Sequence, residues 1–324
     1  DYWKDFDLPQ PTKDINVMRQ NILEWGYCLV EDAMSEEQCE RFITRIHQQA
    51  RGEKLAGVNA KSSTGQYLHS LINKGQVFRE CIEQNPNSVQ AGPLIEQILN
   101  ETLGYGWICH SFLSNGADPG GYPQGMHMDQ GPLLPWVTEE APALFNTMYI
   151  PQDVNELNGG TLIIPGSHKN IIKAGSNGEV GKLPPAINLE AKAGTVMLFD
   201  GRLLHGTGVN HTDKIRFVAA MSNVKSWMRS QENWIVSVDP KIIDIASPKL
   251  LHRMGMQAAT YGGTIEGFGM GASGKVNEIH GSTKYFREAL DSGKYIRVGE
   301  LSSKSSKKDL KKNYTLKGAV KEVK

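Results

Sequence analysis

Short apolar runs separated by glycine, proline and asparagine fill the middle of this 324-residue chain. The runs cover residues 107–113, 143–150, 161–164, 186–191, 195–199 and 215–223. Their lengths, and turn sequences between them such as Asn158-Gly159-Gly160, are typical of β-strands. Because no long helical pattern lies between the runs, the strands are expected to close on themselves as an antiparallel sandwich or a jelly roll.

Helical spacing of apolar residues is found mainly in the first hundred residues. Residues 14–25 and 93–103 each carry apolar side chains at intervals of three and four, which predicts two amphipathic helices. Ser35 followed by Gln38 is a capping-box pattern and predicts the start of another helix. Residues 52–75 show no clear period, and we expect them to form a loop near a pocket.

The chain is therefore interpreted as one domain over residues 1–300 with a tail at 301–324. The domain divides into a helical part at 1–106, a β core at 107–225 and a C-terminal part at 226–300, which is expected to form a lid or a dimer interface. The tail has eight lysines against two acidic residues and so a net charge of 8 − 2 = +6. Such a composition predicts a flexible, solvated segment.

The overall charge indicates what kind of partner the protein has. Its 35 basic and 35 acidic side chains cancel, which argues against a general affinity for nucleic acid or for a membrane surface. A small neutral or anionic substrate fits better. The four cysteines have no C-x-x-C spacing, so we expect reduced thiols and a cytoplasmic location. No apolar run approaches the roughly 18 residues that a membrane crossing needs.

Three residues within the β region form a candidate metal site. His127 and Asp129 are two positions apart, so on an extended backbone both side chains point the same way. His205, at the end of an apolar run and before a glycine turn, is the best candidate for a third ligand. Two histidines and one carboxylate suit non-haem Fe(II), with open coordination positions for oxygen chemistry. A zinc hydrolase uses the same ligand types, so the ligand set alone leaves both open.

Arg216 lies eleven residues beyond His205, at the start of an apolar run. A guanidinium among apolar residues is unfavourable to bury unless it meets an anion, and its planar fork matches a carboxylate. We therefore expect a cosubstrate with a carboxylate at its far end, which favours the iron enzyme over the zinc hydrolase.

Four segments in order, spanning roughly residues 20 to 225, resemble the phytanoyl-CoA dioxygenase family of Fe(II)- and 2-oxoglutarate-dependent oxygenases. The segments are Gly26-Tyr27-Cys28-Leu29-Val30-Glu31-Asp32, Gln124-Gly125-Met126-His127-Met128-Asp129, Asn158-Gly159-Gly160-Thr161-Leu162-Ile163-Ile164-Pro165-Gly166-Ser167-His168-Lys169, and His205-Gly206-Thr207-Gly208-Val209-Asn210 with Arg216. Each motif alone is weak, because H-x-D occurs by chance in many proteins. The ordered set is specific.

The resemblance implies a mainly β fold with helices, in which a double-stranded β-helix core is flanked by N-terminal helices. It implies that His127, Asp129 and His205 hold Fe(II) and that Arg216 binds the distal carboxylate of 2-oxoglutarate. It also implies that Gln124, Thr161 and Thr207 contact the cosubstrate. O₂ takes the last position on the metal. Because Asp129 is present, halogenation is set aside.

Asn146 departs from the family pattern, because many relatives carry an aromatic residue there. An amide at this position is expected to hydrogen-bond the cosubstrate, and the departure favours the natural-product branch of the family. The resemblance then implies hydroxylation, desaturation or rearrangement of a small, secondary-metabolite-like substrate, with release of succinate and CO₂. An acyl-CoA hydroxylase and an inactive β-fold binding protein are the alternatives. Among the other histidines, His168 is expected to stabilise its turn.

Overall fold

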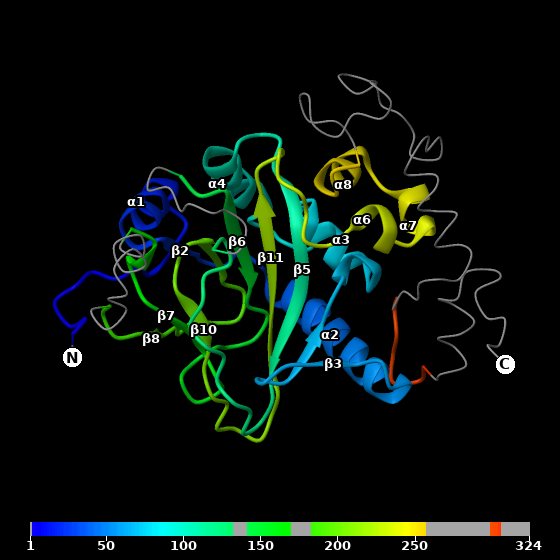
Figure 1. Ribbon diagram of the computed structural model, residues 1–324, viewed down its shortest axis with the longest axis horizontal. Helices are drawn as coiled ribbons and strands as arrows, with labels where there is room; N and C mark the ends of the chain where they lie inside the picture. Colours follow the sequence, from blue (N-terminus) through cyan, green and yellow to red (C-terminus); the bar gives the residue numbers. More distant parts are fainter. Residues whose placement is uncertain (1, 132–140, 170–182, 257–298, 306–324) are drawn as a thin grey trace.

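The computed structural model describes residues 2–131, 141–169, 183–256 and 299–305 (Figure 1). The first helix, α1 (Ile15–Trp25), begins after Asp14, whose carboxylate accepts a hydrogen bond from the Asn16 amide at 2.8 Å. It ends at Gly26, which has a left-handed φ of 82°. A Cβ on Gly26 would lie 2.5 Å from Nδ1 of His168, so only glycine fits there.

The second helix, α2 (Glu36–Ala56), starts with the predicted capping box. The Gln38 amide donates to Oγ of Ser35 at 3.2 Å, and the Ser35 amide donates to Oε1 of Gln38 at 3.0 Å. The helix runs beyond residue 52, so the loop predicted for residues 52–75 is wrong. That segment holds the end of α2, two short strands, β3 (Ala60–Lys61) and β4 (Gln66–Leu68), and a 3₁₀ turn, η1 (Leu71–Asn73).

Eight strands form the large sheet. Besides β3 and β4 they are β1 (Pro11–Thr12), β2 (Tyr27–Val30), β5 (Ile108–Ala117), β6 (Leu144–Tyr149), β9 (Val196–Asp200) and β11 (Arg216–Val224). Their spatial order is β1-β2-β9-β6-β11-β5-β4-β3. All neighbours pair antiparallel except β1 and β2.

A small sheet of three strands lies beside the large one (Figure 1). Its order is β10 (His205–Thr207), β7 (Thr161–Ile163) and β8 (Ile187–Asn188). His127 extends this sheet through an antiparallel bridge to His205. The predicted strands therefore come together as two sheets around a common interior, which confirms the jelly-roll, or double-stranded β-helix, architecture.

The large sheet is buried on both faces, and alternate residues of each strand contribute to two separate cores. On β9, Met197 and Phe199 point inward and pack with residues of the small sheet such as Ile163. Their neighbours Val196 and Leu198 point outward into a second, larger cluster. The inner space between the two sheets is where the candidate site residues meet.

Helices cover the outer face of the large sheet, mostly on the right in Figure 1. Besides α1 and α2 they are α3 (Gln76–Ile82), α4 (Gly92–Leu103), α6 (Trp234–Ser237), α7 (Pro240–Ile245) and α8 (Pro248–Arg253). Trp234, Ile243 and Leu250 are buried in the outer core. The described part of the predicted lid thus packs against the sheet, and residues 257–298 lie outside the described residues. No helix in the described ranges is long and apolar enough to cross a membrane.

A short C-terminal segment, residues 299–302, is bound along α2. Gln49 donates from Nε2 to the Gly299 carbonyl and accepts from the Leu301 amide, both at 2.8 Å. Leu301 is only 2% exposed. Leu301 was expected to begin the flexible tail, but it belongs to the folded part. The tail from residue 306 onward lies outside the described residues.

Candidate active site

The two candidate histidine ligands are held by backbone pairing between β10 and the segment before Asp129. The amide of His127 donates to the His205 carbonyl and the amide of His205 donates to the His127 carbonyl, both at 2.9 Å. Nδ1 of His127 lies 2.9 Å from the Gly125 carbonyl, and Nδ1 of His205 lies 3.0 Å from the Leu203 carbonyl. Because a carbonyl only accepts, each Nδ1 carries the proton and each Nε2 keeps a free lone pair.

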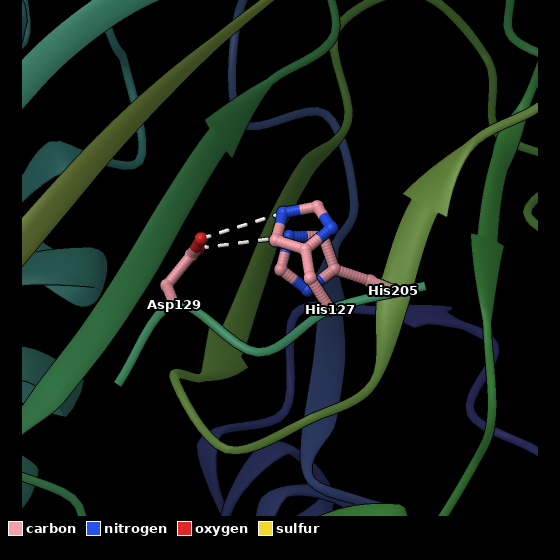
Figure 2. Close-up of side chains that lie close together, drawn as sticks. All are labelled: His127, Asp129 and His205. Carbon is pink, nitrogen blue, oxygen red and sulfur yellow. Dashed lines mark ion pairs between the residues drawn. The ribbon is translucent and has the colours of Figure 1, made fainter. Parts of the chain in front are cut away.

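Asp129 completes a three-residue cluster with both rings (Figure 2). Its Oδ1 lies 3.6 Å from Nε2 of His127, and its Oδ2 lies 3.6 Å from Nε2 of His205. All candidate ligand atoms lie within 4.8 Å of one another. The side chains of His127 and Asp129 are 35% and 30% exposed, so the cluster is partly accessible to solvent.

His205 is the most enclosed of the three candidate ligands, with 12% of its side chain exposed. Burial lowers its pKa, and the nearby His127 lowers it further, although the Asp129 carboxylate acts in the opposite direction. A lowered pKa keeps the imidazole neutral at physiological pH. The neutral form is the one that binds a metal.

Two further polar side chains fix the carboxylate of Asp129. Nδ2 of Asn146 donates to Oδ2 of Asp129 at 2.8 Å, and Oγ of Ser222 donates to Oδ1 of Asn146 at 2.7 Å. Asn146 on β6 and Ser222 on β11 are directly opposite in the sheet register, so they share its inner face. The structure thus places Asn146 against a candidate metal ligand. Its expected contact with a cosubstrate stays a prediction.

Arg216, the first residue of β11, is a buried cation that forms no ion pair with a carboxylate of the described residues. It is 1% exposed, and its side chain donates to the carbonyls of Asn158 and Gly159. Its Nη1 has no hydrogen-bond partner among the residues that the structure describes. Burial lowers the pKa of Arg216 to about 10, so it is still charged at neutral pH. A buried, incompletely bonded guanidinium is suited to bind a carboxylate.

Gln124 and Thr207 form part of a polar network on the inner face. Thr207 donates from Oγ1 to Oε1 of Gln124 at 3.2 Å and accepts from Nδ2 of Asn115 at 2.9 Å. Thr161 pairs with Thr207 across β7 and β10, and its hydroxyl lies 3.7 Å from the sulfur of Met148. The structure therefore places these three sequence-predicted residues on the segment that leads to His127 and on the two paired strands, β7 and β10.

The family model described as Phytanoyl-CoA dioxygenase (PhyH) matches residues 22–218 of this chain. The chain belongs to the phytanoyl-CoA dioxygenase family. The matched range contains all three candidate metal ligands and Arg216, so the resemblance drawn from the motifs is confirmed.

Two fungal relatives of this phytanoyl-CoA dioxygenase family member are named as dioxygenases. This chain is 33% identical to Dioxygenase FUM3 of Gibberella moniliformis over 136 residues. The aligned stretch covers 41% of this chain and 42% of FUM3. This chain is 25% identical to Dioxygenase af480 of Aspergillus fumigatus over 262 residues. The aligned stretch covers 77% of this chain and 80% of af480. The chain thus aligns with less than half of FUM3 but with most of af480.

A solved structure supports the fold of this family member. It superposes with a TM-score of 0.55 on the non-heme alpha ketoglutarate dependent carbocyclase SnoK from nogalamycin biosynthesis. The match has 17% sequence identity and covers 69% of this chain and 92% of SnoK. At this identity the likeness establishes the shared fold.

Three polar residues of this family member's site were not predicted from sequence, namely Ser222, Asn115 and Tyr67. Ser222 lies six residues after Arg216 on the same strand, so the two-residue period of a strand already places both on one face. Asn115 lies just past the predicted end of its strand at residue 113. Tyr67, whose hydroxyl lies 3.5 Å from Nε2 of Gln124, falls in the segment wrongly predicted as a loop.

Proposed function

We propose that this protein is a non-haem Fe(II)- and 2-oxoglutarate-dependent dioxygenase that oxidises a small organic substrate, with release of succinate and CO₂. One observation carries this proposal: a His-Asp-His cluster lies on the inner face of the same jelly roll as the buried Arg216, whose Nη1 has no partner among the described residues. Family membership supports the same reaction class.

The residues present fit iron. Two Nε2 lone pairs and one carboxylate oxygen converge, and such a triad leaves three positions on an octahedral ion. A zinc hydrolase uses the same ligand types but gives the buried Arg216 no function. An inactive binding protein would have no need to keep all three ligand side chains in place.

The residues also fit 2-oxoglutarate. Arg216 would bind the carboxylate that lies farther from the metal, because its Nη1 has no partner among the described residues, while Nε and Nη2 donate to the carbonyls of Asn158 and Gly159 and orient the guanidinium. Gln124, Thr161 and Thr207 would orient the cosubstrate by hydrogen bonds. When bound, iron and 2-oxoglutarate together use O₂ to oxidise a C–H bond. The residues named above would hold both groups next to an apolar inner core, which would limit the access of water.

We further propose that the substrate is a free secondary metabolite and not an acyl-CoA. The amide at Asn146, which we interpret from the resemblance as a departure from the family pattern, supports this choice, and SnoK is named for nogalamycin biosynthesis. Hydroxylation, desaturation and rearrangement are all open to such a site. The buried, unpaired state of all four cysteines supports the predicted cytoplasmic location. A homodimer stays a prediction that light scattering on the purified protein tests.

The test is succinate formation by metal-free protein reconstituted with Fe(II), 2-oxoglutarate and O₂, measured by mass spectrometry with a panel of candidate substrates. We expect succinate to depend on all three additions and to increase with the correct substrate. His127→Ala should abolish it, whereas replacing the exposed His211 by alanine should not. Equal succinate formation by the His127 variant would refute the proposal. Substrate turnover without O₂ would favour the hydrolase.

A further inference from the structure

The three candidate ligands are oriented in two different ways. Both histidine rings are fixed by their own chain segment, because each Nδ1 meets a carbonyl two residues earlier. In the part of the chain that the structure describes, the carboxylate of Asp129 has no such local partner. Among the described residues, its hydrogen-bond donor is Nδ2 of Asn146, 17 residues away on β6.

An aspartate carboxylate turns easily about its last bond and is able to bind a metal through one oxygen or through both. The bond from Asn146 occupies Oδ2 at 2.8 Å. Among the described residues no group donates to Oδ1, which lies 3.6 Å from Nε2 of His127, whereas Oδ2, 3.6 Å from Nε2 of His205, already accepts from Asn146. The geometry points to Asn146 as a positioning residue that holds Asp129 as a one-oxygen ligand, so that three coordination positions stay open for 2-oxoglutarate and O₂.

Asp129 and Ser222 hold the two ends of the Asn146 amide. An asparagine side chain offers a donor and an acceptor of nearly equal shape, so an isolated amide flips between two orientations. A carboxylate oxygen only accepts, so Nδ2 must face Asp129, and the Ser222 hydroxyl donates to Oδ1 at the other end of the amide at 2.7 Å and holds it in this orientation. Asn146 is fully buried, and the two strands that carry the pair are directly hydrogen-bonded. Ser222 is thus a second positioning residue, which acts through Asn146.

This inference rests on the proposed function, because it assumes a metal at the cluster, but its test does not use turnover. Co(II) or Mn(II) alone is titrated into metal-free protein, and its affinity is measured by calorimetry. We expect Asn146→Leu to weaken binding by about 10- to 100-fold, which is the usual effect of losing a partner that orients a metal ligand. Ser222→Ala should weaken it by a smaller factor.

The chain offers matched controls for both substitutions. Asn223 is also fully buried and lies on β11 next to Ser222, but it donates to the Phe145 carbonyl and to Thr147 on the outer face. Ser114 is a buried serine that donates to the Val218 carbonyl at 2.8 Å. Asn223→Leu and Ser114→Ala remove comparable hydrogen bonds. We expect both to lower thermal stability without changing metal affinity.

Two further readouts separate positioning from a general loss of structure. The d–d absorption of bound Co(II) should shift in Asn146→Leu and stay unchanged in Asn223→Leu. Adding Ser222→Ala to Asn146→Leu should have no further effect on affinity, because Ser222 acts only through Asn146. If Asn146→Leu does not fold, the metal affinity and Co(II) absorption of Ser222→Ala test the inference instead.

The inference is overturned if both site variants bind the metal as tightly as the unaltered protein, or if the matched controls weaken binding to the same extent. One other result would also contradict the proposed function. If the unaltered protein binds neither Co(II) nor Mn(II) nor Fe(II), then the cluster is no metal site and both proposals fall.

Discussion

His127 and His205 exchange two backbone hydrogen bonds of 2.9 Å, and the centroids of their rings lie 4.4 Å apart. Sheet pairing therefore brings both rings together. The site is built into the fold, so replacing one ligand side chain should change metal binding far more than stability.

His127→Ala tests this separation. We expect metal affinity to fall by more than the roughly 100-fold that loss of an outer partner produces, because a ligand itself is lost. The melting temperature of the metal-free protein should change little, since the His127 side chain is 35% exposed. Metal content and a thermal melt measure the two effects. A metal-free variant that melts well below the unaltered protein would contradict the view that the pairing alone assembles the site.

Arg216→Met should weaken 2-oxoglutarate binding while leaving metal affinity unchanged. Hydrogen bonds to a charged group contribute about 1.5–3 kcal/mol, so the KM for 2-oxoglutarate should rise by roughly 10- to 100-fold. The rise in melting temperature that 2-oxoglutarate gives the unaltered protein should shrink accordingly. The exposed Lys214, two residues earlier, supplies the control substitution Lys214→Met. An unchanged KM in Arg216→Met would assign the cosubstrate carboxylate to another residue.

His168 predicts a pH dependence of stability. Burial lowers its pKa from the usual 6.5 to about 4. Between these values the unfolded chain takes up a proton that the folded protein does not, so stability from this group is complete above pH 6.5 and is lost as the pH falls towards 4. The loss amounts to roughly 3 kcal/mol. In His168→Gln the free energy of unfolding, measured with urea, should fall less over this range, and parallel pH curves for both proteins would argue against the assignment.

The segment at residues 299–302 should contribute to global stability. Leu301 is 2% exposed and packs against Gly52, where an added Cβ would lie 2.6 Å from the Leu301 Cβ. Leu301→Ala should lower the free energy of unfolding by about 2 kcal/mol, and Gly52→Ala should also destabilise. Leu157→Ala is the control, because Leu157 is 66% exposed. Equal urea midpoints for the Leu301 and Leu157 variants would show that the segment is only loosely attached.

Sequence spacing predicted those parts of the fold that depend on local periodicity. The helix that ends before Gly26 and the capping box at Ser35 and Gln38 are local patterns, and both are present. The short helices α3, α6 and α7 were not predicted. Helices of four to seven residues have too few turns to show a period, and their burial against the sheet is a tertiary effect.

The part of the candidate site that could be predicted from sequence is the set of metal-binding residue types. His127, Asp129 and His205 do converge in the structure, as the ligand types and their order suggested. The bond from Asn146 to Asp129 was not predictable, because it depends on the register that places β6 beside β11. An asparagine in sequence gives no indication of which neighbour its amide will face.

The two faces of β11 have different functions: one carries residues of the candidate site, and the other carries residues of the outer core. Arg216, Val218 and Ser222 face the site or the inner core, whereas Phe217, Ala219 and Met221 lie in the outer core under the helices. A mutant library that varies only Arg216, Val218 and Ser222 would therefore sample new substrates and cofactor geometries while the outer core stays unchanged. A library at the odd-numbered positions would select for thermal robustness, and the two could be screened independently and then recombined.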